Sequence, residues 1–385
     1  MARFWGTNLT ASALFGTSRE NVRQQARRLS ELGFNLVRLH HHDSAWVVPN
    51  IFGDQKSQST RTLNSEMLEK LDWWIKCLKD EGIYIWLDLH VGRQLKAGDQ
   101  IDGFEEISKG GASAELKGYN YVNASIQAAM KRFNEAYVNH LNAYTGLPYK
   151  DDPSIAVMLI TNENDVTHHF GNALLGDKGV PRHAALYMKQ AEAFASRHRL
   201  SRDRVWRSWE YGPSKLFLND LEQRFNANMI AHLRAQGVRV PIVTTSFWGD
   251  ESLSSVPALT VGGIIDAHNG GGVNELESDP IYASTLVHRI AAAQVAGKPF
   301  SVTEWGTEFH GALAPDRIDA LARTIAAFHA SIPVAAPADG YGSLALVREA
   351  ALDNFRQTRS YVSDRASLEA LDRLYAWTLG ESHRL

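Results

Sequence analysis

Short apolar runs alternate with segments of helical spacing along most of the chain, and this alternation is the strongest constraint on its fold. The helical segment 17–33 is followed by the strand-like run Phe34–Leu39, and the helical segment 68–82 by the strand-like run Ile83–Leu89. Each helical segment ends in a glycine, which is a common residue just after a helix. The repeated order of helix, glycine and strand predicts parallel strands joined by covering helices.

The same alternation continues toward the end of the chain and predicts eight strands. The expected strands are 3–9, 34–39, 83–89, 155–160, 241–247, 261–267, 299–303 and 339–347. Further helices are expected at 126–141, 183–200, 218–236, 286–295, 317–328 and 368–379. Eight strands that alternate with helices predict an α/β fold, a (β/α)8 barrel formed by residues 1–385 as a single domain. No linker rich in Pro, Gly or Ser divides the chain.

Two connections are too long to be tight turns. One runs from His90 to Val122, is polar and carries several aromatic residues. The other, at approximately 166–213, contains a helical segment of its own. Long loops at the carboxyl ends of barrel strands shape the substrate site. We therefore expect a barrel with long loops and an inserted helical subdomain on its catalytic face.

Two of the predicted strands run directly into a glutamate. The buried run Ile155–Ile160 leads into Asn162 and Glu163, and the run Pro299–Thr303 leads into Glu304. The carboxyl ends of parallel strands meet at one edge of a barrel, so these two carboxylates are expected to lie close together. A pair of neighbouring carboxyl groups can supply the acid, base or nucleophile that cleaves an acetal.

Other strand ends carry polar residues in a recognisable order. Arg38 follows the second strand, His90 the third and His268 the sixth. With the two glutamates, this set resembles the site of clan A glycoside hydrolases, most closely the family 5 cellulase and mannanase type. The resemblance spans nearly the whole chain. It implies the same barrel and a glycosidase that hydrolyses O-glycosyl bonds.

The resemblance implies a role for each glutamate. In that family the Glu of the Asn-Glu pair is the general acid/base, and the Glu after strand seven is the nucleophile of a retaining double displacement. Carried over, Glu163 protonates the leaving oxygen and Glu304 attacks the anomeric carbon. Asn162 would hydrogen-bond the sugar 2-hydroxyl, and Arg38 would keep the nucleophile ionised.

The remaining candidates would hold the substrate. The resemblance implies that His90 and His268 bind sugar hydroxyls, and one histidine of the run after strand two is expected to face substrate. Trp248 and Trp305 lie beside strand ends, where an aromatic face can stack on a sugar. The candidate substrate-binding residues are therefore Arg38, His42, His90, Asn162, Trp248, His268 and Trp305.

The chain departs from the family pattern at two places. Asn269-Gly270-Gly271-Gly272 follows His268, where the family has an aromatic hydroxyl that bonds the nucleophile. Tyr341–Arg348, around the expected eighth strand, has no Trp to form the floor of the site. These departures leave the exact sugar and linkage open, and endo and exo action as well. A β-linked gluco- or manno-configured glycan is the expected substrate.

A zinc-dependent barrel hydrolase is one alternative, because His40-His41-His42-Asp43 could supply metal ligands with His90 and His268. Adjacent residues of a strand point to opposite faces, so three consecutive histidines cannot all face one metal, and no metal site is expected. A second alternative is a carbohydrate-binding barrel without catalytic activity.

The composition limits the partners. A net charge of −3 gives no electrostatic footprint for nucleic acid or an anionic membrane. No apolar run approaches the about 20 residues of a membrane span. The expected partner is an oligo- or polysaccharide, without a cofactor, and the sequence does not decide the oligomeric state.

Met1–Arg3 passes straight into a strand without a signal-peptide segment, so a native start predicts a cytoplasmic protein and a trimmed start an extracellular or periplasmic one.

Overall fold

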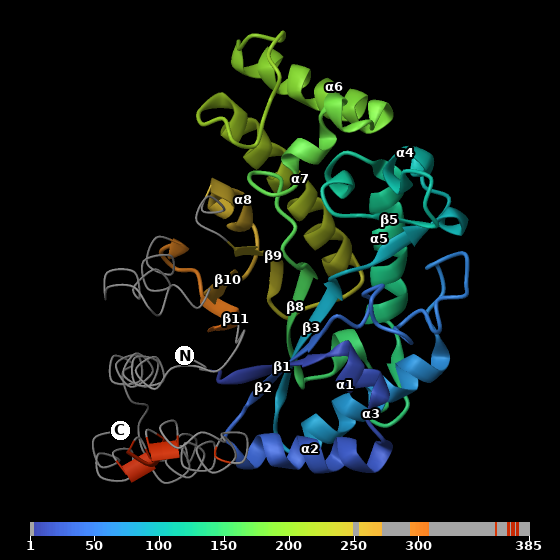
Figure 1. Ribbon diagram of the computed structural model, residues 1–385, viewed down its shortest axis with the longest axis vertical. Coiled ribbons are helices and arrows are strands. Elements are labelled where there is room, and N and C mark those ends of the chain that lie inside the picture. Colours follow the sequence, from blue (N-terminus) through green and yellow to red (C-terminus); the bar gives the residue numbers. More distant parts are fainter. Residues whose placement is uncertain are drawn as a thin grey trace.

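The computed structural model describes residues 4–248, 254–271 and 293–307, and a few residues between 359 and 376. Seven strands of this part form one sheet in the order β1-β2-β3-β8-β9-β10-β11, and all neighbouring strands are parallel (Figure 1). The strands are β1 (Gly6–Thr10), β2 (Leu36–His40), β3 (Tyr84–His90), β8 (Ile155–Thr161), β9 (Ile242–Trp248), β10 (Ile265–Gly271) and β11 (Phe300–Thr307). The spatial order follows the chain order, as in a barrel built from βα units.

The first and last strands of this sheet approach each other. The side-chain amide of Asn8 on β1 donates to the carbonyl oxygen of Thr303 on β11, at 3.1 Å. The sheet therefore curves into a nearly closed barrel, which confirms the predicted α/β barrel fold. The eighth strand expected at 339–347 and the helix expected at 317–328 lie outside the described residues, so a single domain over 1–385 stays a prediction.

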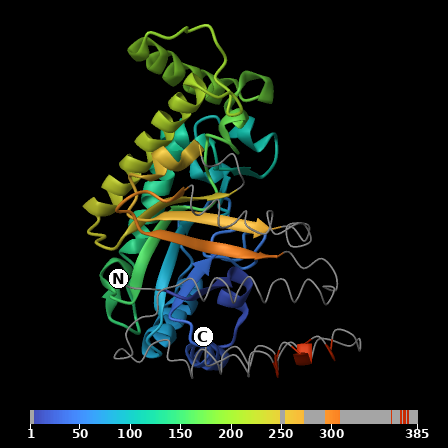
Figure 2. The same cartoon turned by 90° about the vertical axis from the view of Figure 1, so that its left-hand side faces the viewer.

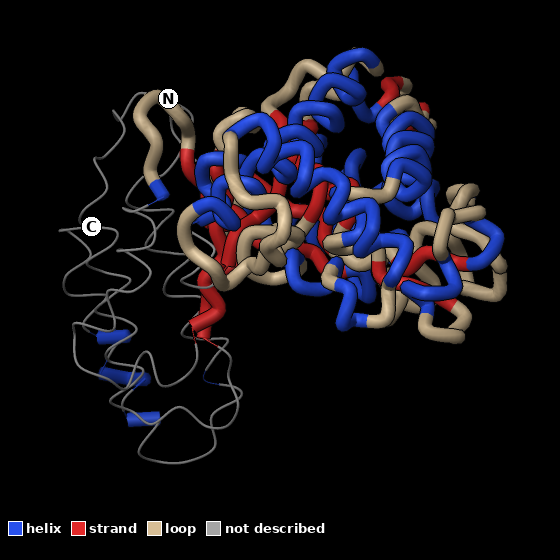
Figure 3. The backbone as a smooth tube through the Cα atoms, turned by 90° about the horizontal axis from the view of Figure 1, so that it is seen from above, coloured by secondary structure: helices blue, strands red, loops and turns tan. Residues whose placement is uncertain are grey.

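Helices lie outside the strands in the view from above (Figure 3). In the described part they are α1 (Ala11–Gly16), α2 (Arg19–Glu31), α3 (Ser65–Asp80), α4 (Phe104–Ser108), α5 (Ala124–Val138), α6 (Pro181–His198), α7 (Pro213–Ala235) and α8 (Val256–Leu259). Side-chain oxygens of Ser18, Asn64 and Asn123 accept from the first-turn amides of α2, α3 and α5, which fixes where these helices begin. Gly33 and Gly82 follow α2 and α3 with positive φ, as the glycine positions predicted.

Several boundaries differ from the sequence prediction, and two of the differences occur at α5 and β10. α5 ends at Val138, and Leu141 lies exposed in the short hairpin of β6 (Leu141–Asn142) and β7 (Leu147–Pro148), which the 3-10 turn η3 (Tyr149–Asp151) follows. β10 begins four residues later than expected, because Gly262 and Gly263 turn the chain after α8. β10 also ends later than expected, at Gly271, which places His268 within the strand rather than after it.

The barrel interior has an apolar layer below a polar one. Trp86, Val157, Leu159 and Val243 pack together as a buried cluster inside the sheet. Asp88 lies two residues after Trp86 on β3, and its side chain is on the same face of the strand. The interior thus changes from packed apolar side chains to charged ones toward the carboxyl ends of the strands, where the sequence placed the chemistry.

Two long excursions form the rim at these strand ends. The first contains the hairpin of β4 (Gln94–Lys96) and β5 (Ser113–Glu115), the 3-10 turns η1 (Ala97–Asp99) and η2 (Tyr119–Tyr121), and α4. The second contains η4 (Gly171–Leu174), η5 (Gly176–Lys178) and α6, which lies beyond one end of the barrel with the N-terminal end of α7 (Figures 1 and 2).

The two excursions are joined by contacts at the start of α6. Glu106 on α4 accepts from the backbone amides of Arg182 and His183, at 3.0 and 2.8 Å. The His183 ring also lies 2.8 Å from the side-chain amide of Asn123.

Within the described residues, no helix has the length and apolar content that crossing a membrane requires.

Candidate active site

Arg38, on β2, contacts two of the residues that the sequence placed at strand ends, Glu304 and Asn162, and also contacts Asp88. Its Nη1 donates to Oε1 of Glu304 at 2.7 Å, and its Nη2 donates to Oδ1 of Asn162 at 2.6 Å. Its Nε donates to both carboxylate oxygens of Asp88, at 3.1 and 3.0 Å. Burial alone would lower the pKa of Arg38, but the charges of Asp88 and Glu304 outweigh this and raise it. The Arg38 guanidinium is therefore a permanent positive charge in direct contact with the Glu304 carboxylate.

Glu304, on β11, is held as an anion. Its Oε1 lies 2.7 Å from Arg38 Nη1 and 3.0 Å from Nε2 of His40. Burial alone would raise the pKa of Glu304, but the hydrogen bond from His40 and the positive charges of His268 and Arg38 lower it well below its ordinary value. The side chain keeps 32% of its surface exposed, so substrate can reach an ionised carboxylate.

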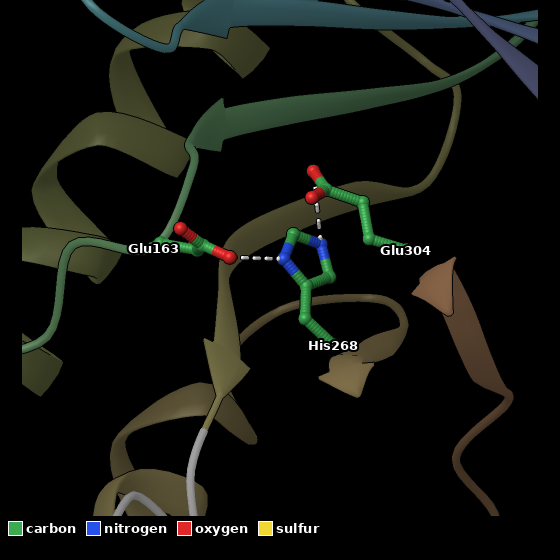
Figure 4. A group of neighbouring side chains, drawn as sticks. All are labelled: Glu163, His268 and Glu304. Carbon is green, nitrogen blue, oxygen red and sulfur yellow. Dashed lines mark hydrogen bonds and ion pairs between the residues drawn. The ribbon is translucent and has the colours of Figure 1, made fainter. Parts of the chain in front are cut away.

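His268, on β10, lies between the two predicted catalytic glutamates (Figure 4). Its Nδ1 is 2.7 Å from Oε1 of Glu163, and its Nε2 is 3.0 Å from Oγ1 of Thr303 and 3.6 Å from Oε1 of Glu304. Burial alone would lower the pKa of His268, but hydrogen bonds to Asp266 and Glu163 raise it to about 9. At neutral pH the ring is therefore an imidazolium that donates from both nitrogens.

Glu163 stands where the chain leaves β8. Its backbone has a φ of +48°, a left-handed conformation that is uncommon for residues other than glycine and that clusters at functional sites. The next residue, Asn164, is anchored on both sides. Its amide donates to Oγ1 of Thr245 at 3.0 Å, and its side-chain oxygen accepts from the amide of Gly118 at 3.0 Å. These bonds hold the strained turn that directs Glu163 toward His268.

The two carboxylates are close neighbours. One carboxylate oxygen each from Glu163 and Glu304 and one ring nitrogen of His268 all lie within 4.8 Å of one another. A set of two carboxylates and one imidazole can ligate a metal ion. Here, however, Arg38 already lies against Glu304, and the imidazolium form of His268 has no lone pair to offer. Positive charge from Arg38 and His268 therefore already lies against these carboxylates.

His42 and His90 lie elsewhere, which corrects the expectation that they face substrate. The His42 ring stacks on Tyr137 of α5 with a centroid distance of 5.2 Å, and Nε2 of His90 lies 3.0 Å from Oδ1 of Asn134 on α5. Burial lowers the pKa of His42 and lowers that of His90 well below its ordinary value. Both rings pack between the strands and a covering helix.

His40 instead is the histidine of the run that reaches the glutamates. It ends β2, which extends to residue 40, so it shares a strand face with Arg38. The expectation missed His40 because it ended the strand at residue 39. Asp88 and Asp266 were also missed, although a lone aspartate inside each of the apolar runs IYIWLDL and VGGIIDA was a signal.

Trp248 and Trp305, the two tryptophans expected to stack on a sugar, lie on strands β9 and β11. Trp248 ends β9 and pairs with His268, and Trp305 follows Glu304 on β11. The side chains of Trp248 and Trp305 lie outside the part that the structure describes. A different tryptophan, Trp46, is 64% exposed and contacts His41, with 4.8 Å between the ring centroids.

Comparisons with known proteins give likeness at the level of fold. No family of known sequences matches the chain, and no curated protein is significantly similar to it. An endo-β-1,4-mannanase from Thermotoga petrophila matches with a TM-score of 0.52 and 13% identity over 83% of this chain, which spans 65% of that protein. A hyperthermostable endo-1,4-β-D-mannanase from Thermotoga petrophila RKU-1 matches with a TM-score of 0.54 and 13% identity, over 85% of this chain and 86% of that one. At this identity the likeness shows that the chain has the barrel fold of these glycoside hydrolases.

Proposed function

We propose that this protein is a retaining glycoside hydrolase that cleaves β-linked gluco- or manno-configured glycans. Glu304 is the nucleophile and Glu163 the general acid/base. The observation that carries this proposal is the approach of carboxylate oxygens of Glu163 and Glu304 within 4.8 Å. Retaining glycosidases separate their carboxyl groups by about 5–5.5 Å, whereas inverting ones need about 6.5–9.5 Å for a water molecule.

The electrostatics support the division of roles. Glu304 is kept ionised by Arg38 and His40, as a nucleophile must be. Its carboxylate attacks the anomeric carbon, the glycosidic C–O bond breaks, and Glu163 gives a proton to the leaving oxygen. In the second step Glu163 takes a proton from water, the water oxygen attacks the anomeric carbon, and Glu304 leaves. Two inversions give net retention.

His268 supplies the proton that Glu163 needs. Transfer of one proton from the imidazolium of His268 to the carboxylate of Glu163 gives a neutral imidazole and a carboxylic acid. A shift of one proton along the 2.7 Å contact from His268 Nδ1 to Glu163 Oε1 therefore produces the acid without an outside donor. Departure of the leaving group consumes that proton, and the second step returns it from water.

Asn162 is oriented to bind the sugar. A guanidinium has only donors, so the side-chain oxygen of Asn162 must face Arg38, and the amide nitrogen is directed away from it. That nitrogen can donate to the sugar 2-hydroxyl, a contact that strengthens in an oxocarbenium-like transition state. The β-linkage and the gluco or manno configuration are proposed from the family resemblance of the site and from the two mannanases with the same fold.

A panel of β-1,4-glucan, β-1,3-glucan, mannan and aryl β-glycosides tests the proposal. The wild-type protein is expected to release sugar from at least one of them, and Glu304→Gln is expected to abolish the release. Glu192→Gln, an exposed glutamate on α6, is the matched control and should leave the rate unchanged. Activity on α-glycosides alone, or binding without turnover, would reject the proposal in favour of another barrel function.

A further inference from the structure

The nucleophile Glu304 has a second strong contact besides Arg38, and it comes from His40. Nε2 of His40 lies 3.0 Å from Oε1 of Glu304, and Nδ1 of His40 lies 2.6 Å from Oδ2 of Asp88. The His40 side chain is 4% exposed and that of Asp88 is fully buried. The three residues thus form a chain of contacts from β3 through β2 to β11.

The partners of the ring determine where its protons are. Burial alone would raise the pKa of Asp88, but the charge of Arg38 and the hydrogen bond from His40 lower it, so Asp88 is an acceptor only. Both nitrogens of the His40 ring face acceptors, Nδ1 the carboxylate of Asp88 and Nε2 the carboxylate of Glu304, so the ring serves here as a hydrogen-bond donor.

The sequence after His268 supplies no hydroxyl group for the nucleophile. The residues after His268 are Asn269 and three glycines, and none of them has a hydroxyl group. We propose that His40, oriented by Asp88, is the positioning residue for the nucleophile Glu304, in the place that an aromatic hydroxyl takes in the family this site resembles. This inference rests on the proposed function, because it assigns His40 a role in that reaction.

The contacts also select which oxygen of Glu304 reacts. Among the described residues, the closest contacts of Arg38, His40 and His268 with this carboxylate are all made by Oε1. Oε2 is left to attack the anomeric carbon. When the C–O bond forms, Oε1 becomes the carbonyl oxygen of the glycosyl ester, and the hydrogen bond from His40 remains. When the ester is hydrolysed, the same bond stabilises the departing carboxylate.

Paired substitutions separate the two contacts of His40. The side-chain nitrogen of glutamine can take the place of Nε2, so His40→Gln keeps a donor for Glu304 and loses the bond to Asp88. His40→Asn places its nitrogen near Nδ1, so it keeps the bond to Asp88 and loses the donor for Glu304. His40→Phe loses both. His140→Phe is the control, since it removes a histidine that also contacts an aspartate, Asp72 at 2.9 Å, at the other end of the barrel.

Two readouts test the proposal. The first is kcat/KM on an aryl β-glycoside across pH. His40→Asn and His40→Phe should lose about 10²–10³-fold, as expected for removal of one donor to a developing charge, and His40→Gln should lose much less. The acid limb should move to higher pH in His40→Asn and His40→Phe. Equal losses in His40→Gln and His40→Asn, or a larger loss in His40→Gln, would overturn the proposal.

The second readout does not depend on activity. Titration of the Glu304 carboxyl carbon, followed by ¹³C NMR, should give a higher pKa in His40→Phe than in the wild type and no change in His140→Phe. Among the described residues, the charged and titratable groups around this carboxylate are Arg38, His40, His41, Asp88, Glu163, Asp266 and His268, and all except His40 are the same in both proteins. An unchanged Glu304 titration would overturn the role of His40. Absence of turnover in the wild type would instead reject the proposed function.

Discussion

His268 lies opposite Glu304 in the pairing of β10 with β11, because a bulge after Ala267 shifts the register by one residue. Bulges redirect side chains and occur next to active sites. Here the shifted register turns the His268 ring toward both Glu163 and Glu304. One imidazolium therefore links the two carboxylates on which the proposed reaction depends.

The acid/base role of Glu163 predicts a dependence on the leaving group. Glu163→Ala should lower kcat/KM for β-1,4-linked oligosaccharides by about 10²–10⁴-fold, the usual contribution of a general acid. Aryl β-glycosides with acidic phenols should lose far less, because their leaving groups need no proton. Added azide should accelerate turnover and give a β-glycosyl azide. Equal losses on both substrate types, without a response to azide, would count against this assignment.

The raised pKa of His268 predicts an alkaline loss of stability. Its pKa rises from 6.5 to about 9 in the folded protein, so the stabilisation is fully present below about pH 6.5 and is lost as pH rises through about 9. Its size is on the order of 3 kcal/mol. Urea unfolding should give a larger stability difference between wild type and His268→Gln at pH 6 than at pH 10. A difference that does not change with pH would contradict the imidazolium form.

The exposed ring of Trp46 predicts a contribution to binding longer substrates. Trp46 contacts His41, the neighbour of His40, so it lies on the Glu304 side of the site. Trp46→Ala should raise KM for oligosaccharides by about fivefold, the scale of an aromatic contact of about 1 kcal/mol, and should leave small aryl glycosides unaffected. Trp209→Ala, on the rim insertion, is the matched control because Trp209 is 53% exposed. Equal effects of the two substitutions would exclude a specific role for Trp46.

The loop that anchors Asn164 predicts a local packing cost. Gly118 has a φ of +80°, and a Cβ there would lie 2.7 Å from Cβ of Phe170. Gly118→Ala should therefore lose about 2–4 kcal/mol in the free energy of unfolding, from backbone strain and from the clash. Gly110→Ala is the control, because Gly110 has a similar φ of +78° and no atom within 4 Å. Urea unfolding of both variants separates the strain, which they share, from the clash.

The barrel could be predicted from the sequence because short runs rich in apolar residues alternate with helical segments along the chain. Glu163 and Glu304 were predictable for the same reason, since each directly follows such a run. The choice among the three consecutive histidines was not, because it depends on whether β2 ends at residue 39 or 40. The bulge before His268 has no local sequence signal, and it decides where that ring points.

The charged layer inside the barrel was only partly predictable. Asp88 and Asp266 are conspicuous in apolar strands, yet their partners come from neighbouring strands far away in sequence. Trp46 could not be distinguished from a core tryptophan, because exposure depends on the folded loop.

Covalent trapping tests the central claim most directly. A 2-deoxy-2-fluoro β-glycoside with an activated leaving group slows the second step more than the first in a retaining enzyme, so the glycosyl-enzyme accumulates. Mass spectrometry of the digested protein should find one sugar attached to the peptide that contains Glu304, and Glu304→Gln should show none. Absence of an adduct on wild-type protein that hydrolyses β-glycosides, together with products of inverted anomeric configuration, would contradict the account.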